Sequence, residues 1–312
     1  MHDLEKILAC PVCKSKLKYN TSSFLCPRCQ SEYPIVDGIP ILLPSKLSKF
    51  KKMEANHHSK LARDYDSRHQ LNTFRSTVFA DQLVSGLRYL PEDSLIIEIG
   101  CGTGFHGIKL MKKGYNSILL TEISLGMIKQ AQENVEKEKL SSRCRLMVLD
   151  AEELPFLSNS IDGIYMNAVL HHLPSPIDCL KEIKRCLKSQ GLVCLVSEPN
   201  RWIYCAIRSL YFIGKTPHSI GDVATRGFNE KQIRTMFKEA GLRIVNMKTF
   251  WFISGFVDSG MRVLFELLHL KQRFKIPLFL DKSILLIEKS LDKIPLINTI
   301  GWRWTCVGKK MP

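Results

Sequence analysis

Residues 96–104 read Ile-Ile-Glu-Ile-Gly-Cys-Gly-Thr-Gly, and this stretch decides the fold. An apolar strand runs there directly into an acid, Glu98, and three alternating glycines. Glycine accepts a positive φ, and its missing Cβ lets backbone N–H groups approach a ligand closely. The helix expected over residues 105–113 directs its positive end at the same point. The stretch therefore predicts a strand, a turn and a helix that bind a small ligand through the backbone.

The glycine turn alone leaves two cofactor classes open. Residues 102–107, Gly-Thr-Gly-Phe-His-Gly, also satisfy the dinucleotide pattern G-x-G-x-x-G of dehydrogenases. In either class Glu122, about twenty residues further on, is placed to bind ribose hydroxyls. The segments that follow must distinguish the two.

Further strand patterns alternate with helical patterns along the chain. We expect strands at 118–122, 145–150, 161–167 and 191–197, and a helix at 177–187. This alternation predicts an α/β fold, in which a parallel sheet carries helices on both faces. Ligands of such sheets bind at the carboxyl ends of the strands. Four polar side chains are expected there: Glu98, Glu122, Asp150 and Asn167.

An ordered set of motifs narrows this prediction. The motifs are Leu-Ala-Arg-Asp-Tyr-Asp at 61–66, Glu98-x-Gly100-x-Gly102-x-Gly104, Glu122, Asp-Ala-Glu-Glu-Leu-Pro-Phe at 150–156, Leu-His-His-Leu at 170–173 and Leu-Lys-Ser-Gln-Gly at 187–191. Together they resemble the class I S-adenosylmethionine-dependent methyltransferases, in the branch of small single-chain enzymes, over residues 61–250 and the final strand. The resemblance implies a doubly wound, mostly parallel seven-stranded sheet and S-adenosyl-L-methionine as the cofactor.

The same resemblance implies a role for individual residues. Glu98 and the glycine turn are expected to hold the methionine part of the cofactor, under a lid that includes Tyr65. Glu122 is expected to accept charge-assisted hydrogen bonds from the ribose hydroxyls. Ile123 is expected against adenine, with Asp150 and the backbone after it at the adenine edge. The predicted cofactor-binding residues are Tyr65, Glu98, Gly100, Gly102, Gly104, Glu122, Ile123, Asp150, Ala151 and Asn167.

Two adjacent histidines, His171 and His172, are the candidates for a catalytic base. They open a predicted helix, where one normally packs or caps and only one can point at a substrate. A base is required only if the acceptor must lose a proton.

Two cysteine pairs mark the amino-terminal segment. Cys10-Pro-Val-Cys13 and Cys26-Pro-Arg-Cys29 have the spacing of a zinc ribbon, in which four thiolates complete a closed structural Zn²⁺ site. About forty residues bury little core, so the metal would supply folding free energy. Disulfides or a redox pair are the alternatives. The other seven of the 11 cysteines are scattered through predicted core elements, as in a reduced cytosolic chain.

The segment around these cysteines, including Val-Asp-Gly-Ile-Pro at 36–40, resembles a second family. Its members are small zinc-ribbon proteins that activate tRNA and translation-factor methyltransferases by docking on the catalytic subunit. The resemblance implies a ribbon fused in cis, which stabilises the enzyme by docking, with nucleic-acid contact as a second role.

Charge and composition divide the chain. The net charge is +15, of which residues 1–63 contribute +6 and residues 241–312 contribute +7, so the flanks are basic and the centre is almost neutral. Basic flanks suit RNA phosphates or an anionic membrane. Charged residues interrupt the amino end, and no run of eighteen apolar residues occurs, so we expect a cytoplasmic protein, with peripheral contact at the inner face of a membrane as an option.

The expected divisions are a zinc ribbon at 1–44, a basic linker and lid helix at 45–70, the cofactor-binding core at 71–250, and a hydrophobic helical insertion with the final strand at 251–312.

Apolar segments at 202–213, 261–270, 277–280 and 284–287 do not alternate like surface helices. They are expected to pack together as a lid over the substrate or to contact a membrane or a lipid chain.

These observations predict a methyltransferase acting on a small or lipid-linked acceptor at oxygen, nitrogen or carbon. Two alternatives remain open: an RNA methyltransferase that uses the ribbon and the basic flanks, and a scaffold that binds the cofactor without turnover. The sequence indicates no oligomeric state.

Overall fold

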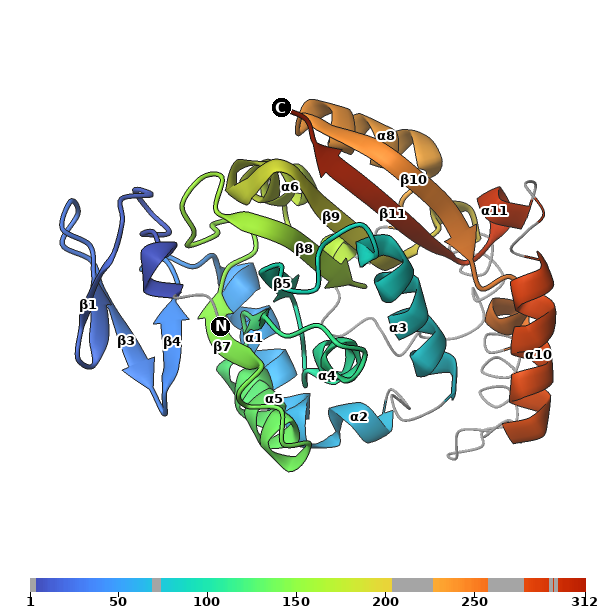
Figure 1. Cartoon of the computed structure of the whole chain (residues 1–312), viewed down its shortest axis with the longest axis horizontal. Coiled ribbons are helices and arrows are strands. Elements are labelled where there is room, and N and C mark those ends of the chain that lie inside the picture. Colours follow the sequence, from blue (N-terminus) through green and yellow to red (C-terminus); the bar gives the residue numbers. More distant parts are fainter. Residues whose placement is uncertain (1–3, 69–73, 204–226, 258–277, 292–293, 295–296) are drawn as a thin grey trace.

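The computed structural model describes residues 4–68, 74–203, 227–257, 278–291, 294 and 297–312. A twisted sheet crosses the molecule, with helices on either side (Figure 1). The part of the sheet after the amino-terminal segment has seven strands in the order β7-β6-β5-β8-β9-β11-β10. The strands are β5 (Ile96–Ile99), β6 (Ile118–Glu122), β7 (Cys144–Leu149), β8 (Ile161–Asn167), β9 (Leu187–Pro199), β10 (Leu242–Phe250) and β11 (Arg303–Lys310).

The strands from β7 to β9 are parallel, whereas β11 runs antiparallel to both β9 and β10. The predicted doubly wound, mostly parallel seven-stranded sheet is therefore confirmed. The motif at 187–191, which precedes the strand expected at 191–197, is itself the start of β9; Gln190 takes a φ of 66° there, and the register with β8 shifts.

Two apolar cores lie on opposite faces of the sheet. One contains side chains of α3 (Phe74–Leu87), α4 (Phe105–Lys112) and α5 (Leu125–Lys137). The other contains side chains of α6 (Pro176–Cys186) and α8 (Glu230–Glu239). Because both faces are covered, β5 is buried at every position, which explains its unbroken apolar run around one glutamate.

The amino-terminal ribbon is continuous with this sheet. It consists of a short helix η1 (Leu4–Lys6) and the strands β1 (Lys18–Asn20), β2 (Ser23–Leu25), β3 (Glu32–Val36) and β4 (Ile39–Leu42). β4 pairs in parallel with β7, which makes a sheet of eleven strands in the described chain. Leu8 and Phe24 of the ribbon belong to the same buried cluster as Phe156 after β7. Docking was expected from the sequence, but a shared sheet and core were not.

The linker after the ribbon is an ordered helix. α1 (Lys49–Leu61) begins at Ser48, whose hydroxyl accepts a hydrogen bond from the backbone N–H of Lys51. The helix contacts α5 and continues through η2 (Ala62–Asp64) into α2 (Tyr65–Arg68). Figure 1 shows that it lies across the carboxyl ends of the parallel strands, where a ligand is expected.

The carboxyl-terminal insertion contributes α10 (Leu278–Leu291) beside α3, and the short α11 (Ile297–Ile300). The apolar segments expected at 277–280 and 284–287 fall almost entirely within this one helix. Most of the segment at 202–213 and all of that at 261–270 lie outside the described residues. Within the described chain, no helix is both long and apolar enough to cross a membrane.

Candidate active site

A cavity of about 340 Å³ opens at the carboxyl ends of β5, β6, β7 and β8, under α1. Most of the residues predicted to bind the cofactor line it, and they come from segments far apart in the chain. They are Tyr65, Gly100, Gly102, Glu122, Ile123, Asp150, Ala151 and Asn167. Glu98 and Gly104 are not among the lining residues. The structure thus gathers eight of the ten predicted side chains or turn positions in one place.

Glu122 is held by backbone donors at the end of β6. Its Oε2 accepts from the N–H of Gly102 at 3.2 Å, and its Oε1 accepts from the N–H of Ile123 at 2.8 Å. Gly102 has a φ of 53°, which turns its N–H toward the carboxylate at little steric cost. These contacts fix the carboxylate at the cavity wall, as binding two vicinal hydroxyls requires.

Glu98 lies behind the turn rather than in the cavity. It is 1% exposed, and its Oε2 accepts from the hydroxyl of Tyr165 at 2.7 Å. Burial raises the pKa of this carboxyl to about 8, against the opposing effects of Tyr165 and the backbone N–H of Gly107. The position of Glu98 therefore supports a role in fixing β5, β8 and α4, and does not support the direct contact with the cofactor that the resemblance implied. Gly104, the other predicted residue outside the cavity lining, is the N-cap of α4 and has a φ of 81°.

Asp150 at the end of β7 is paired with a lysine from the linker helix. Lys51 Nζ lies 2.6 Å from Asp150 Oδ2 and also contacts Glu152. Burial disfavours the charged amine, but these two carboxylates outweigh it and raise the pKa of Lys51. The sequence did not single out Lys51, because a lysine in a basic linker looks like a solvated surface residue.

Two buried polar atoms at the cavity have no hydrogen-bond partner within the described chain: Asn167 Oδ1 and His106 Nε2. An unpaired buried acceptor is costly unless a ligand or water satisfies it. Burial lowers the pKa of His106 to about 4, so this ring is neutral and can accept a hydrogen bond. Together with the glycine turn and Glu122, these acceptors fit a ligand that carries ammonium and hydroxyl donors. The sequence analysis assigned no role to His106, so its place in the cavity is new.

The two candidate histidines separate in the structure. His171 is buried outside the cavity lining, and its Nδ1 lies 2.8 Å from Glu198 Oε2. Burial lowers the pKa of His171 although Glu198 opposes this. Glu198 also accepts from the backbone N–H of Val169 and Leu170, so the pair fixes η3 (Leu170–His172). This placement makes His171 a structural residue and does not support its expected role as a base.

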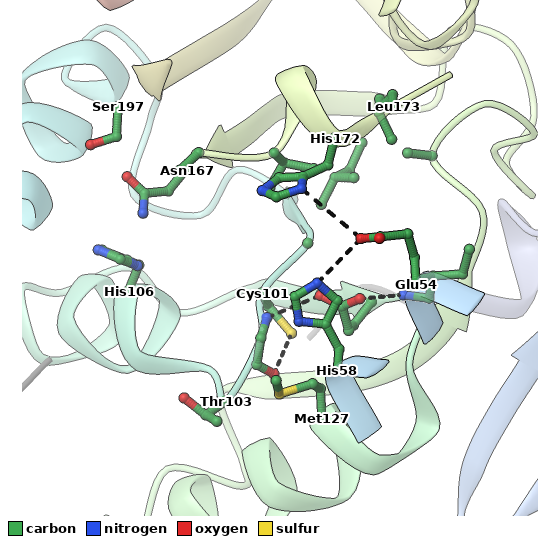
Figure 2. A pocket seen from close by; sticks show the side chains of 18 of the residues that line it. Glu54, His58, Cys101, Thr103, His106, Met127, Asn167, His172, Leu173 and Ser197 are labelled. Carbon is green, nitrogen blue, oxygen red and sulfur yellow. Dashed lines mark hydrogen bonds and ion pairs between the residues drawn. The ribbon is translucent and has the colours of Figure 1, made fainter. Parts of the chain in front are cut away.

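His172 does line the cavity, and it faces two side chains of α1 (Figure 2). Its Nδ1 is 4.0 Å from Glu54 Oε2, and the same oxygen is 3.5 Å from His58 Nε2. Neither Glu54 nor His58 was identified from the sequence, since both lie in the segment expected to be a linker.

Part of the remaining wall is apolar, although Arg303 and Ser197 also line the cavity. Phe50, Phe79, Leu173 and Trp251 line it, and the rings of Phe79 and Trp251 meet edge to face at 4.6 Å. The indole Nε1 of Trp251 is buried and has no partner within the described residues. This part of the cavity can therefore contact an aromatic ring and donate one hydrogen bond.

The four predicted metal ligands converge within the ribbon. The Sγ atoms of Cys10, Cys13, Cys26 and Cys29 all lie within 4.8 Å of one another. Four thiols at this separation match a tetrahedral structural zinc site with no open position. The closest sulfur pair, Cys13 with Cys26, is 3.4 Å apart, so the cysteines are not disulfide-bonded.

Comparison with known families agrees with both parts of the chain. Residues 97–195 match a methyltransferase domain, and residues 2–38 match the Trm112p-like proteins. The chain is a methyltransferase with a Trm112p-like zinc ribbon. The enzyme depends on S-adenosylmethionine, and eight of the ten residues predicted to bind this cofactor line the cavity.

Relatives of the methyltransferase part differ in their acceptors. A demethylmenaquinone methyltransferase of Lactiplantibacillus plantarum is 29% identical over 191 residues, which cover 56% of this chain and 81% of the relative. A tRNA U34 carboxymethyltransferase of Citrifermentans bemidjiense is 29% identical over 128 residues, covering 38% and 39%.

Solved structures support the fold. The complex of the Haloferax volcanii Trm112 methyltransferase activator with a methyltransferase superposes with a TM-score of 0.51 at 15% identity, covering 86% of this chain and 100% of that one. Phosphoethanolamine N-methyltransferase 2 of Haemonchus contortus, bound to S-adenosyl-L-methionine, gives a TM-score of 0.54 at 18% identity, covering 86% and 61%.

Proposed function

We propose that this methyltransferase acts on a ring-bearing, lipid-linked acceptor of the hydroquinone type. The observation that carries the proposal is the apolar wall of the cavity, where Phe79, Trp251 and Leu173 face the space beside the predicted cofactor site. Such a wall contacts the faces of an aromatic ring and a hydrocarbon chain better than it contacts phosphate. The demethylmenaquinone methyltransferase of L. plantarum, whose length is 81% matched, is named for an acceptor of this chemistry.

The cofactor, when bound, supplies an electrophilic methyl group. The chain's own residues align the acceptor and exclude water, which can provide much of the rate enhancement. We expect Glu122, Asn167 and the glycine turn to hold the cofactor, and Trp251 to donate a hydrogen bond to an acceptor oxygen.

A lipid-linked acceptor would be reached at a membrane surface, and α10 supports this location. Phe279 and Leu286 are 68% and 67% exposed, and Leu280 and Ile287 beside them are exposed as well. Phe279 and Leu286 are seven residues apart, as are Leu280 and Ile287, so the two members of each pair lie on one face of the helix. Since residues 241–312 carry a charge of +7, apolar burial and attraction to anionic lipid would act on the same surface. We propose peripheral attachment at the inner face of a membrane.

RNA is the second candidate acceptor. The basic ribbon and linker favour it, and the tRNA U34 carboxymethyltransferase of C. bemidjiense is a relative over part of its length. The non-catalytic scaffold is disfavoured by the acid and glycine positions that line the cavity, Gly100, Gly102, Glu122 and Asp150.

Labelled S-adenosylmethionine incubated with the protein and fractionated cell extract separates these possibilities. We expect label in the organic-extractable lipid fraction, and in a purified demethylated quinol. Label in RNA that is sensitive to ribonuclease would replace the proposal with the second candidate. The absence of label from every fraction, with tight cofactor binding intact, would support the scaffold.

A further inference from the structure

We propose that Glu54 is a positioning residue that orients His172, and that His172 accepts the proton from the acceptor hydroxyl. The inference rests on the proposed function, because it concerns the same reaction. Of the residues in α1, Glu54 is the only one that is buried, at 8% exposure. A buried carboxylate is costly unless it is paired. The structure pairs it with imidazoles at the cavity.

Glu54 lies between two rings that approach from different elements. Figure 2 shows His58 of α1 and His172 of η3 directed at the same carboxylate. The distances from Glu54 Oε2 are 3.5 Å to His58 Nε2 and 4.0 Å to His172 Nδ1, and the two rings are 6.3 Å apart. The 4.0 Å separation between Glu54 Oε2 and His172 Nδ1 is longer than a hydrogen bond, and catalytic hydrogen bonds are often long before substrate binds and shorten in the complex.

The nitrogen of His172 that faces Glu54 is Nδ1, and this orientation determines what the ring can do. A carboxylate beside Nδ1 favours the tautomer that carries its proton on Nδ1, so the lone pair is left on Nε2. The same carboxylate stabilises the imidazolium that forms when Nε2 takes a proton. Glu54 thereby gives His172 the two properties of a general base.

The surrounding charged groups leave this role to His172. His171 stacks on it with ring centres 4.1 Å apart, but its own Nδ1 is held by Glu198 on the far side. Lys51, one turn before Glu54 on α1, is paired with Asp150. His58 shares the Glu54 carboxylate and lies near Tyr65, with ring centres 6.4 Å apart.

In the resulting step, the acceptor O–H bond breaks and its proton passes to His172 Nε2. The activated ring carbon forms a bond to the methyl carbon while the methyl–sulfur bond breaks, and that electron pair remains on sulfur. The ring C–H proton then leaves to water, which restores the aromatic ring, and His172 Nε2 returns its proton to the oxygen, so the methylated hydroquinone forms with the release of one net proton. No oxidant or reductant is needed.

The kinetic test compares Glu54→Gln with the parent on two acceptors. With a phenolic quinol, kcat should fall about 10- to 100-fold, while the affinity for the cofactor, measured by calorimetry, stays within about twofold. With a nitro-substituted analogue that is already ionised at the assay pH, the loss should nearly vanish, because no base is required. Glu54→Asp should recover part of the rate. His57→Gln, an exposed neighbour on α1, is the matched control.

A second readout does not depend on the acceptor. Nitrogen-15 NMR of the histidine rings, with His172→Gln for assignment, should show the Nδ1–H tautomer of His172 in the parent and a mixture in Glu54→Gln. The proposal is overturned if the tautomer is unchanged, or if Glu54→Gln loses as much rate on the ionised analogue as on the phenol. If no quinol is methylated at all, the proposed function fails, and the NMR comparison still decides the pairing of Glu54 with His172.

Discussion

Two glutamates at the ends of neighbouring strands illustrate how environment assigns a role. Glu122 is fixed by backbone N–H groups at the cavity wall, whereas Glu98 is enclosed against Tyr165 behind the turn. In the sequence both are an acid at the end of an apolar strand. The pattern therefore located both residues correctly in the fold, but it could not tell which carboxylate faces the ligand.

Replacement of Glu122 by Ala should weaken cofactor binding by about 2–3 kcal/mol, the usual loss when a charge-assisted pair is removed. Calorimetry with S-adenosylmethionine measures this directly. Glu133→Ala, which removes an exposed carboxylate of α5, should leave the affinity unchanged. Equal affinity in Glu122→Ala and the parent, or tight NADH binding by the parent, would show that the assignment is wrong.

Glu98 should make folding stability depend on pH. Its pKa is about 8 in the folded state, against 4.5 as the reference value, so the folded protein retains a proton that the unfolded chain releases. Stability from this group is therefore lost as the pH rises from about 5 to 8. Glu98→Gln keeps the acceptor for Tyr165 without the charge, and its stability relative to the parent should rise by on the order of 1 kcal/mol per pH unit in this window.

Urea unfolding at pH 5, 6.5 and 8 measures this difference. The neutral His106 contributes an opposite slope below its unfolded pKa, but it is present in both proteins and cancels in the comparison. A constant difference between Glu98→Gln and the parent over the whole window would contradict the raised pKa.

At the scale of elements, the ribbon and the cavity are connected through α1. β4 pairs with β7, and α1 follows β4 after only a short turn. The same helix then brings Lys51 to Asp150 and Glu54 to His172. Metal binding at one end of the molecule is thus linked to the geometry of the cavity by continuous backbone.

We expect one equivalent of zinc per chain, and we expect Cys26→Ser to lose it together with ordering of the ribbon. Because α1 depends on the ribbon for its position, this variant should also bind the cofactor more weakly, by about tenfold or 1.4 kcal/mol. Metal analysis and calorimetry give the two quantities, and Cys144→Ser, a buried cysteine outside the cluster, is the control for zinc content. A metal-free parent with a protease-resistant amino end would disprove the zinc site.

At the scale of the whole molecule, sequence patterns were sufficient for the five parallel strands β5 to β9, the position of the glycine turn and the cysteine cluster, whereas the seven-stranded sheet was implied by the family resemblance. These are local patterns with a fixed spacing. The parallel pairing of β4 with β7 was not predictable in this way, because edge pairing depends on which surfaces meet after folding. The burial of Glu54 and the separation of His171 from His172 also depend on packing between distant segments. In the sequence, Glu54, His171 and His172 look like ordinary helix residues.

The distribution of charge and exposed apolar side chains predicts how the molecule associates with lipid. α10 presents Phe279 and Leu286 at one end of the molecule, and Figure 1 places the ribbon at the other end. The parent should co-sediment with anionic vesicles, weakly with neutral ones, and less as salt increases, because screening reduces the attraction of the basic segment.

Phe279→Ser with Leu286→Ser should reduce vesicle binding at least about tenfold, since two large side chains no longer enter the interface. The double change Val12→Ser with Tyr19→Ser, which alters exposed apolar residues of the ribbon, should bind like the parent. Circular dichroism shows whether α10 is retained. If the parent fails to bind anionic vesicles at low salt but binds structured RNA with micromolar affinity, the basic flanks serve nucleic acid, and the exposed face of α10 requires a different partner.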